Sequence, residues 1–376
     1  MTNANPADVE RRFSLLVPGL LDLPVAERET ALAQLGQLPA LERFLARARQ
    51  QPFTGSADEP AVEADHVITD HVTTDYASTM FALFGLPVSS SQDTPIAPAS
   101  YLADAGQPAP AWCLRADPVH LIPDRDQLLL SGPEALFLSQ AEAERLATEL
   151  NTLFEEQGWR LEAVTPTRWY LHLPQDPHIH TTALSTVLGA AISDYLPSGP
   201  NGKKWHRIMN EVQMLLHGSA VNRDRQSHGQ LTVSSLWFWG GGETPDFGHS
   251  QWSKVWSREP VSLGLAQFLR TPSKPWPVDA TQLLSEAHSP GEHLIVYDPI
   301  AQAYESEGIE AWVRNVHSFN EQWMAPLLAA LQQRDINQLS LYSGDGRLFT
   351  LSPLGLKRWW RRNKPLARYC VSRQHA

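Results

Sequence analysis

The sequence predicts an α/β protein, with a core sheet covered by helices on both faces and interrupted by an inserted α+β domain. Strand-like and helix-like segments alternate at both ends of the 376-residue chain, a rhythm typical of one sheet with crossover helices. Between the two ends, residues 111–173 have the pattern strand, strand, helix, strand, strand. We therefore assign residues 1–110 and 243–376 to a discontinuous core, and residues 111–242 to the inserted domain.

The core begins with a buried strand in the segment RFSLLVPGLL. Pro18 and Gly19 end this strand, because proline cannot donate to a strand ladder and glycine permits a turn. Residues 26–50 have leucines at helical spacing, divided at Pro39. Three further elements follow the insertion: a strand at 293–299 that ends in Asp298, a long helix or helix pair at 309–335, and a strand–turn–strand unit at 336–351.

Two helices of the inserted domain have distinct sequence signals. Ser139 is expected to cap a helix that ends at Gly158, with Glu142 three residues after the cap in a capping box. Residues 201–218 form an amphipathic helix with a second, polar stripe. That stripe either faces solvent or lines a cleft, and its members are His206, Asn210, Gln213 and His217.

Two segments of the inserted domain combine arginines with carboxylates, amides and histidines. The planar guanidinium group donates a fork of hydrogen bonds that suits phosphate or carboxylate. Each segment alone is compatible with a surface ion-pair network, but their occurrence in one domain favours an anion-binding site. The candidates are Arg115, Asp117, His120, Asp124 and Arg125, then Asn222, Arg223 and Arg225, with His206, Asn210 and His217 from the helix stripe.

The segment LTVSSLWFWGGG predicts a strand that runs into a close-approach turn beside this site. Trp237 and Trp239 lie on one side of the strand and form either a pocket wall or core, and Gly240, Gly241 and Gly242 let another group come near. The glycines match neither a dinucleotide fingerprint nor a phosphate-binding loop.

Composition limits the classes of function. The chain has 30 basic and 41 acidic residues, a net charge of −11, which argues against a protein whose whole surface binds nucleic acid. Its 2 cysteines, Cys113 and Cys370, lie far apart and indicate no cysteine-rich zinc site. We see no signal peptide and no apolar run long enough for a membrane helix, so we expect a cytoplasmic protein without a membrane partner.

The segments WCLRADPVHLIPDRDQLLL and WHRIMNEVQMLLHGSAVNRDRQSHGQLTVSSLWFWGGG resemble the bacterial RpfE-type regulatory-protein family. The resemblance extends from about Trp112 to Arg362. That family is related to cofactor-independent phosphoglycerate mutases of the archaeal type. The resemblance implies an alkaline phosphatase-like core sheet and an inserted domain of the substrate-binding type. It also implies that Asn222, Arg223, Arg225 and the three glycines contact a substrate.

The metal-binding positions of these mutases are only partly matched. Pro18 stands where their first strand carries a metal-binding Asp, and Gly346 stands where a His would follow Asp345. Asp298 is kept, but no His follows where one is expected. Two divalent ions need several carboxylates and imidazoles. Asp298 and Asp345 are therefore weak metal candidates that cannot hold such a centre alone.

We therefore expect a degenerate phosphoglycerate mutase-like protein that needs no cofactor and has a regulatory role. It would bind a phosphorylated or carboxylated small molecule, or a protein partner. The alternative is an active phosphomutase or phosphatase with a rearranged Mn or Zn site. That site would add Asp65, His66, Asp70 and His71 to the two late aspartates, although these residues also suit a polar loop.

A second alternative is binding of nucleic acid or an acidic partner through the C-terminal tail. Basic residues that flank aromatic ones can bind phosphates and stack on bases. The competing interpretation is a C-terminal element whose tryptophans dock onto an acidic body. The residues are Lys357, Arg358, Arg361 and Arg362, which flank Trp359 and Trp360.

Overall fold

A computed structural model describes residues 10–24, 31–53, 76–86, 93–125, 127–245 and 248–373. The chain divides into two compact units, Met1–Pro87 with Phe247–Ala376 (unit 1) and Val88–Asp246 (unit 2). Residues 88–110, which the sequence analysis assigned to the core, group with unit 2. The domain boundaries expected from the sequence remain a prediction.

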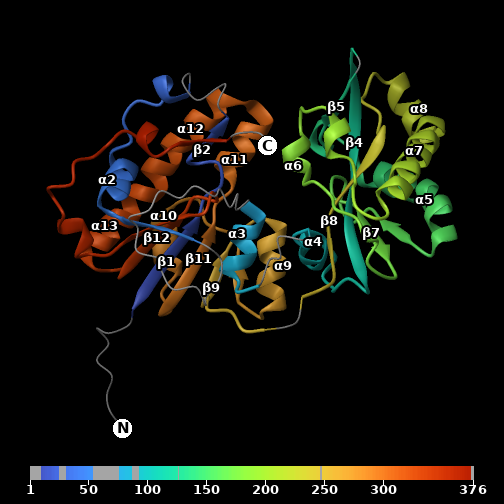
Figure 1. The fold of residues 1–376 in the computed structure, drawn as a ribbon. Coiled ribbons are helices and arrows are strands. Elements are labelled where there is room, and N and C mark those ends of the chain that lie inside the picture. Colours follow the sequence, from blue (N-terminus) through green and yellow to red (C-terminus); the bar gives the residue numbers. More distant parts are fainter. Residues whose placement is uncertain are drawn as a thin grey trace, which may run out of the picture. The chain divides into compact units, whose positions relative to one another are not determined.

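Unit 1 is built on a seven-stranded sheet (Figure 1). Its five neighbouring strands β10, β9, β11, β1 and β12 are parallel, and β13 and β3 complete the sheet in antiparallel pairs. In sheet order the strands are β10 (Ser273–Lys274), β9 (Lys254–Trp256), β11 (Gly291–Val296), β1 (Arg11–Leu16), β12 (Gln338–Tyr342), β13 (Arg347–Leu351) and β3 (Arg49–Pro52). A separate parallel pair joins β2 (Asp22–Pro24) to β14 (Val371–Arg373).

Helices cover both faces of this sheet, as the sequence predicts. Phe13 and Leu15 of β1 belong to a core cluster shared with α2 (Pro39–Arg47), α10 (Ala280–Glu286), α12 (Ile309–Phe319) and α13 (Ala325–Gln333). In contrast, α9 (Pro260–Phe268) packs on β9 and β10, and its buried Leu265 and Phe268 lie outside that cluster. This places α9 on the opposite face. Two further helices of unit 1 are α3 (Tyr76–Leu83) and α11 (Pro299–Glu307).

Proline explains two helix boundaries in unit 1. Pro39 is at the start of α2, where its missing N–H costs nothing. The expected helix or helix pair at 309–335 is two helices, α12 and α13, joined by a π-helical turn at Asn320–Met324. Pro326 follows this turn and cannot donate the regular helical hydrogen bond, so the interruption falls where the sequence allows it.

Unit 2 is an antiparallel sheet organised around one long strand, β4 (Trp112–Asp124). That strand pairs with β7 and β8 along its first part and with β5 near its end, while β6 pairs with β7. The other strands are β5 (Gln127–Ser131), β6 (Arg160–Glu162), β7 (Tyr170–Leu173) and β8 (Ser235–Gly242). The helices are α4 (Ile96–Ala105), α5 (Gln140–Phe154), α6 (Leu184–Val187), α7 (Gly202–Gly218) and α8 (Ala220–Ser227).

Local signals in unit 2 are confirmed at α5 and corrected at β8. Ser139 caps α5, and Glu142 completes the capping box. The three glycines are the last residues of β8 itself, not a turn after it. Within the described ranges, no helix has the length and apolar character to cross a bilayer.

Candidate functional site

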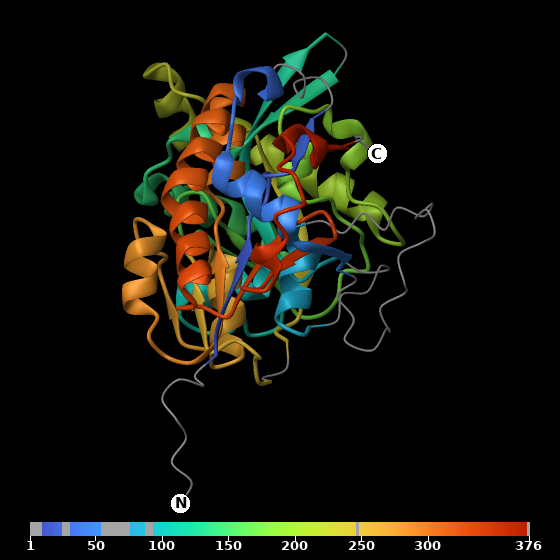
Figure 2. The ribbon, with the colours of Figure 1, turned by 90° about the vertical axis from the view of Figure 1, so that its left-hand side faces the viewer.

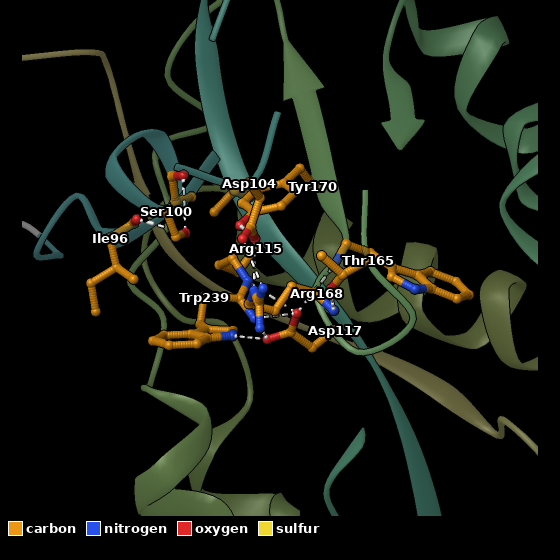
Figure 3. A network of polar contacts seen from close by, with 12 residues as sticks. Ile96, Ser100, Asp104, Arg115, Asp117, Thr165, Arg168, Tyr170 and Trp239 are labelled. Carbon is orange, nitrogen blue, oxygen red and sulfur yellow. Dashed lines mark hydrogen bonds and ion pairs between the residues drawn. The ribbon is translucent and has the colours of Figure 1, made fainter. Parts of the chain in front are cut away.

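Arg115 and Asp117 form a buried ion pair on β4 (Figure 3). Two residues apart on one strand, they project from the same face. The Asp117 carboxylate accepts from Arg115 Nε at 3.0 Å and Nη2 at 2.8 Å, and from Trp239 Nε1 at 2.8 Å. Burial lowers the pKa of Arg115, but the Asp117 carboxylate outweighs it and the pKa is raised. Both charges are thus neutralised inside unit 2.

A second arginine–aspartate pair lies beside the first. Asp104 of α4 accepts from Arg168 Nε and Nη2, both at 2.7 Å, and from the Tyr170 hydroxyl at 2.6 Å. The Arg115 guanidinium lies 5.4 Å from the centre of the Tyr170 ring and 5.2 Å from that of Trp239. The two pairs therefore form one network that ties α4 to the sheet of unit 2 (Figure 3).

Arg225 and Asn222 of α8 also have internal partners. Arg225 is 1% exposed, and it donates to Glu142 Oε1 at 2.7 Å, to the Leu231 carbonyl at 2.8 Å and to the Leu136 carbonyl. The Asn222 amide donates to the Leu216 and Val233 carbonyls and accepts from the Val233 N–H. These contacts hold α8 in place and occupy both side chains.

The other predicted contacts are dispersed over unit 2. Arg223 is exposed and donates to the Gly218 carbonyl, while Asn210 and His217 are exposed on α7. Asp124 and Arg125 lie at the exposed end of the β4–β5 hairpin. Among the described residues, no hydrogen bond joins these side chains to Arg115, and the anion site predicted from them stays a prediction. Two histidines are fixed by backbone carbonyls: His120 Nδ1 lies 2.8 Å from the Thr232 oxygen, and His206 Nε2 lies 2.8 Å from the Pro197 oxygen.

The glycines of β8 do allow a close approach, but it is by the protein's own chain. A Cβ on Gly242 would lie 2.4 Å from the Pro95 Cβ, and one on Gly240 would lie 3.1 Å from the Ile96 Cβ. A Cβ on Gly241 would lie 2.5 Å from the Leu114 Cδ2. The start of α4 and β4 therefore fill the space that the missing side chains leave. Trp237 is core, 2% exposed, and its indole N–H donates to the Thr182 carbonyl at 2.9 Å.

In unit 1, two carboxylates lie where parallel strands end, the usual place for a ligand in an open α/β sheet. Glu259 follows β9 and caps α9, accepting from the Val261 N–H at 2.9 Å and the Ser262 N–H at 2.7 Å. Asp298 follows β11 and accepts from the Gln302 amide at 2.5 Å. Burial raises the pKa of Glu259 to about 7 and that of Asp298 to about 6. The sequence analysis missed Glu259, although Pro260 is of the type that begins a helix and so marks the residue before it as the cap.

The described residues of this edge do not fit a two-metal centre. Asp345, which follows β12, is paired with Arg347, whose Nε donates at 2.8 Å, and it also accepts from the Ser343 hydroxyl. Pro18, which follows β1, offers no side-chain ligand. Among the residues the structure describes, no group of three or more His, Cys, Asp or Glu is placed to hold a metal ion. Asp65, His66, Asp70 and His71 lie outside the described residues.

A polar cavity of about 400 Å³ lies on one face of the unit 1 sheet. Cross-strand pairing sets Ser14 opposite Ser340, Ser340 opposite Thr350, and Thr350 opposite Arg49. This row, the polar sheet row, occupies the face opposite Phe13 and Leu15, because side chains alternate along a strand. The cavity is lined by the row together with Arg47 and Arg358, among others.

The cavity is positively charged because three arginines line it: Arg47, Arg49 and Arg358. Arg47 Nη1 donates to the Leu356 carbonyl at 2.7 Å, but its buried Nε has no hydrogen-bond partner in the part of the chain that the structure describes. Burial, and then the charge of Arg43, lower the pKa of Arg47. Glu292 also lines the cavity, but Arg12 pairs with it at 2.9 Å. Within the described ranges, no carboxylate pairs with the guanidinium groups that line the cavity, so an anion there would meet positive charge that is not neutralised.

The parallel sheet of unit 1, interrupted in the chain by the antiparallel unit 2, defines the class as an α/β fold with an inserted domain. Over 135 residues the chain is 25% identical to a "Probable 2,3-bisphosphoglycerate-independent phosphoglycerate mutase" of Geobacter sulfurreducens. The match covers 35% of this chain and 33% of that protein, so the chain spans about a third of the curated relative.

Two solved structures are similar to this chain over most of its length. The PH0037 protein from Pyrococcus horikoshii matches 92% of this chain and 88% of its own, with a TM-score of 0.55 and 12% identity. A cofactor-independent phosphoglycerate mutase from Thermoplasma acidophilum matches 97% of this chain and 96% of its own, with a TM-score of 0.47 and 13% identity. No protein-family model matches the chain. The predicted α/β fold is confirmed.

Proposed function

We propose that this chain is a degenerate phosphoglycerate mutase-like protein that binds a phosphate- or carboxylate-bearing small molecule without turning it over. A regulatory role, a cytoplasmic location and independence from metal cofactors belong to the same proposal. The observation that carries it is the contrast within unit 1. The arginines that line the cavity pair with no carboxylate among the described residues, whereas Asp345 is paired with Arg347 and Pro18 supplies no ligand.

We propose that the anion site lies in unit 1, and not in unit 2 as expected from the sequence. In unit 2, Arg115 and Arg225 are engaged by Asp117 and Glu142. In unit 1, Arg49 is exposed and lines the cavity together with Arg47, and neither pairs with a carboxylate among the described residues. A guanidinium that is not neutralised by a carboxylate is the better anion donor, because it has no internal partner to give up.

Thermal shift and calorimetric titration with 3-phosphoglycerate, 2-phosphoglycerate and inorganic phosphate in chelator-treated buffer test this proposal. A ligand of the native state raises the Tm by mass action. We expect a shift that Arg49→Gln abolishes and Arg43→Gln keeps, since Arg43 is on α2 but does not line the cavity. Arg223→Ala tests the unit 2 site predicted from the sequence, and loss of the shift there would return the site to unit 2.

An active metal-dependent phosphomutase or phosphatase is the second candidate. The buried carboxylates Glu259 and Asp298 at the carboxyl edge favour it, because perturbed pKa values cluster at functional sites. Turnover well above background that requires Mn or Zn and is abolished by Asp298→Ala would establish this candidate and overturn the binding-only proposal.

A further inference from the structure

The C-terminal part of unit 1 presents a surface formed by residues 357–364, here called the tryptophan–arginine surface. It is anchored by Leu356 and Leu366, which are 7% and 2% exposed and belong to the core cluster. Between these anchors, Trp359 is 80% exposed and Trp360 is 64% exposed. The interpretation in which the tryptophans dock this element is therefore wrong. Two adjacent exposed indoles mark an interaction site better than a core contact.

The charge around these indoles is positive. Lys357, Arg362 and Lys364 are exposed, and none of them pairs with a carboxylate in the part of the chain that the structure describes. Arg358 donates to the Arg47 carbonyl at 3.3 Å, and Arg361 donates to the Ala48 carbonyl at 3.0 Å, at the end of α2. Residues 346–376 contain no Asp or Glu, although the whole chain has a net charge of −11. This surface therefore differs in sign from the rest of the molecule.

We infer that the tryptophan–arginine surface binds single-stranded nucleic acid. The indole faces of Trp359 and Trp360 stack on bases, and the surrounding cations bind backbone phosphates. The two rings lie 6.2 Å apart at 83°, so they present two separate faces rather than one closed pair. A stacked base needs an accessible aromatic ring, and both indoles are largely exposed.

The neighbouring polar cavity favours nucleic acid over a lipid bilayer. Arg358 belongs to both the surface and the cavity wall, which continues into the hydroxyls of the polar sheet row. Hydroxyls and guanidiniums can hydrogen-bond sugar and phosphate groups, whereas the apolar part of a bilayer cannot occupy such a cavity. The segment is irregular, with short 3-10 turns at Gly355–Lys357 and Leu366–Arg368, and lacks the apolar helical face of an interfacial anchor.

Fluorescence anisotropy of the full chain with a labelled oligouridylate at low salt tests the inference. We expect the double variant Trp359→Ala/Trp360→Ala to bind about tenfold more weakly or worse. Phe137→Ala is the matched control, because it removes an aromatic ring that is 86% exposed on unit 2. The variant Lys357→Gln/Lys364→Gln should lower the dependence of log Kd on log salt by about one to two units.

Three results would overturn the inference: no binding at low salt, equal loss of affinity in Phe137→Ala, or binding to phosphatidylserine vesicles but not to the oligonucleotide. Exposed Leu354 makes the vesicle arm necessary. Tm values of all variants check that they fold. The Trp359→Ala/Trp360→Ala protein should keep its response to phosphoglycerate, and Arg49→Gln should keep most of its oligouridylate affinity. The two proposals can therefore fail separately.

Discussion

The buried pair of Arg115 and Asp117 shows why single residues are hard to assign from sequence. An arginine two residues from an aspartate reads equally well as a ligand fork or as an internal pair. Burial decides between these two interpretations, because Arg115 is 6% exposed and Asp117 is 0% exposed. That burial depends on β8 and β7, which lie on either side of β4. Likewise the partner of Arg225 is Glu142, 83 residues away, which no local pattern indicates.

Removing Asp117 should be costly, because it would leave the Arg115 charge buried without its partner. We expect Asp117→Ala to lower the free energy of unfolding by about 3–5 kcal/mol. Asp224→Ala, which removes an exposed carboxylate of the same unit, should change it by less than about 0.5 kcal/mol. Urea unfolding of both variants measures the difference. A loss below about 1 kcal/mol in Asp117→Ala would show that water reaches the Arg115 guanidinium.

Glu259 should make stability depend on pH. Its pKa is raised to about 7 in the folded protein, so between pH ~4.5 and 7 the folded state holds a proton that the unfolded state has lost. Its contribution to stability is thus present at low pH and is lost as the pH rises toward 7. Glu259→Gln should flatten the fall in Tm across this window, whereas exposed Glu321→Gln should leave it unchanged. Parallel slopes in the two variants would contradict this.

At the scale of elements, the sequence predicted features that depend on neighbouring residues. It did not predict close contacts between segments that lie far apart in the chain. The capping box of α5 and the division at Pro39 depend on neighbouring residues and were predicted correctly. The role of the β8 glycines depends on Pro95 and Ile96, more than a hundred residues earlier, so the sequence alone left it open. The cavity was missed for the same reason, because its lining includes residues of five strands that lie far apart in the sequence.

Gly242 tests the packing of α4 on β8. In Gly242→Ala the new methyl group would meet Pro95 at 2.4 Å, and we expect a loss of about 1–3 kcal/mol from overpacking. Gly218→Ala is the matched control, because a Cβ there meets nothing within 4 Å. Chemical denaturation of both variants gives the comparison. Equal stability would mean that α4 can move away from β8 at little cost.

At the scale of the whole molecule, removal of metal tests whether the stability of the folded chain depends on a bound ion. The described residues lack a metal-binding group of three donors, so we expect dialysis against a chelator to leave the Tm unchanged. Elemental analysis of the untreated protein should find well under one Mn or Zn per chain. A stoichiometric ion whose removal lowers the Tm would support the rearranged site and direct attention to Asp65, His66, Asp70 and His71.

The strands of the unit 1 sheet, which Figure 2 shows in a second view of the whole chain, carry two kinds of side chain on their two faces. In β1, Phe13 and Leu15 serve the helix-covered core, while Ser14 between them faces the cavity. Substitutions at alternate positions can therefore change the lining of the cavity while the packing that keeps the chain folded stays intact. Related sequences can therefore diverge at the strand positions that face the cavity. The positions that face the core are under separate selection for folding.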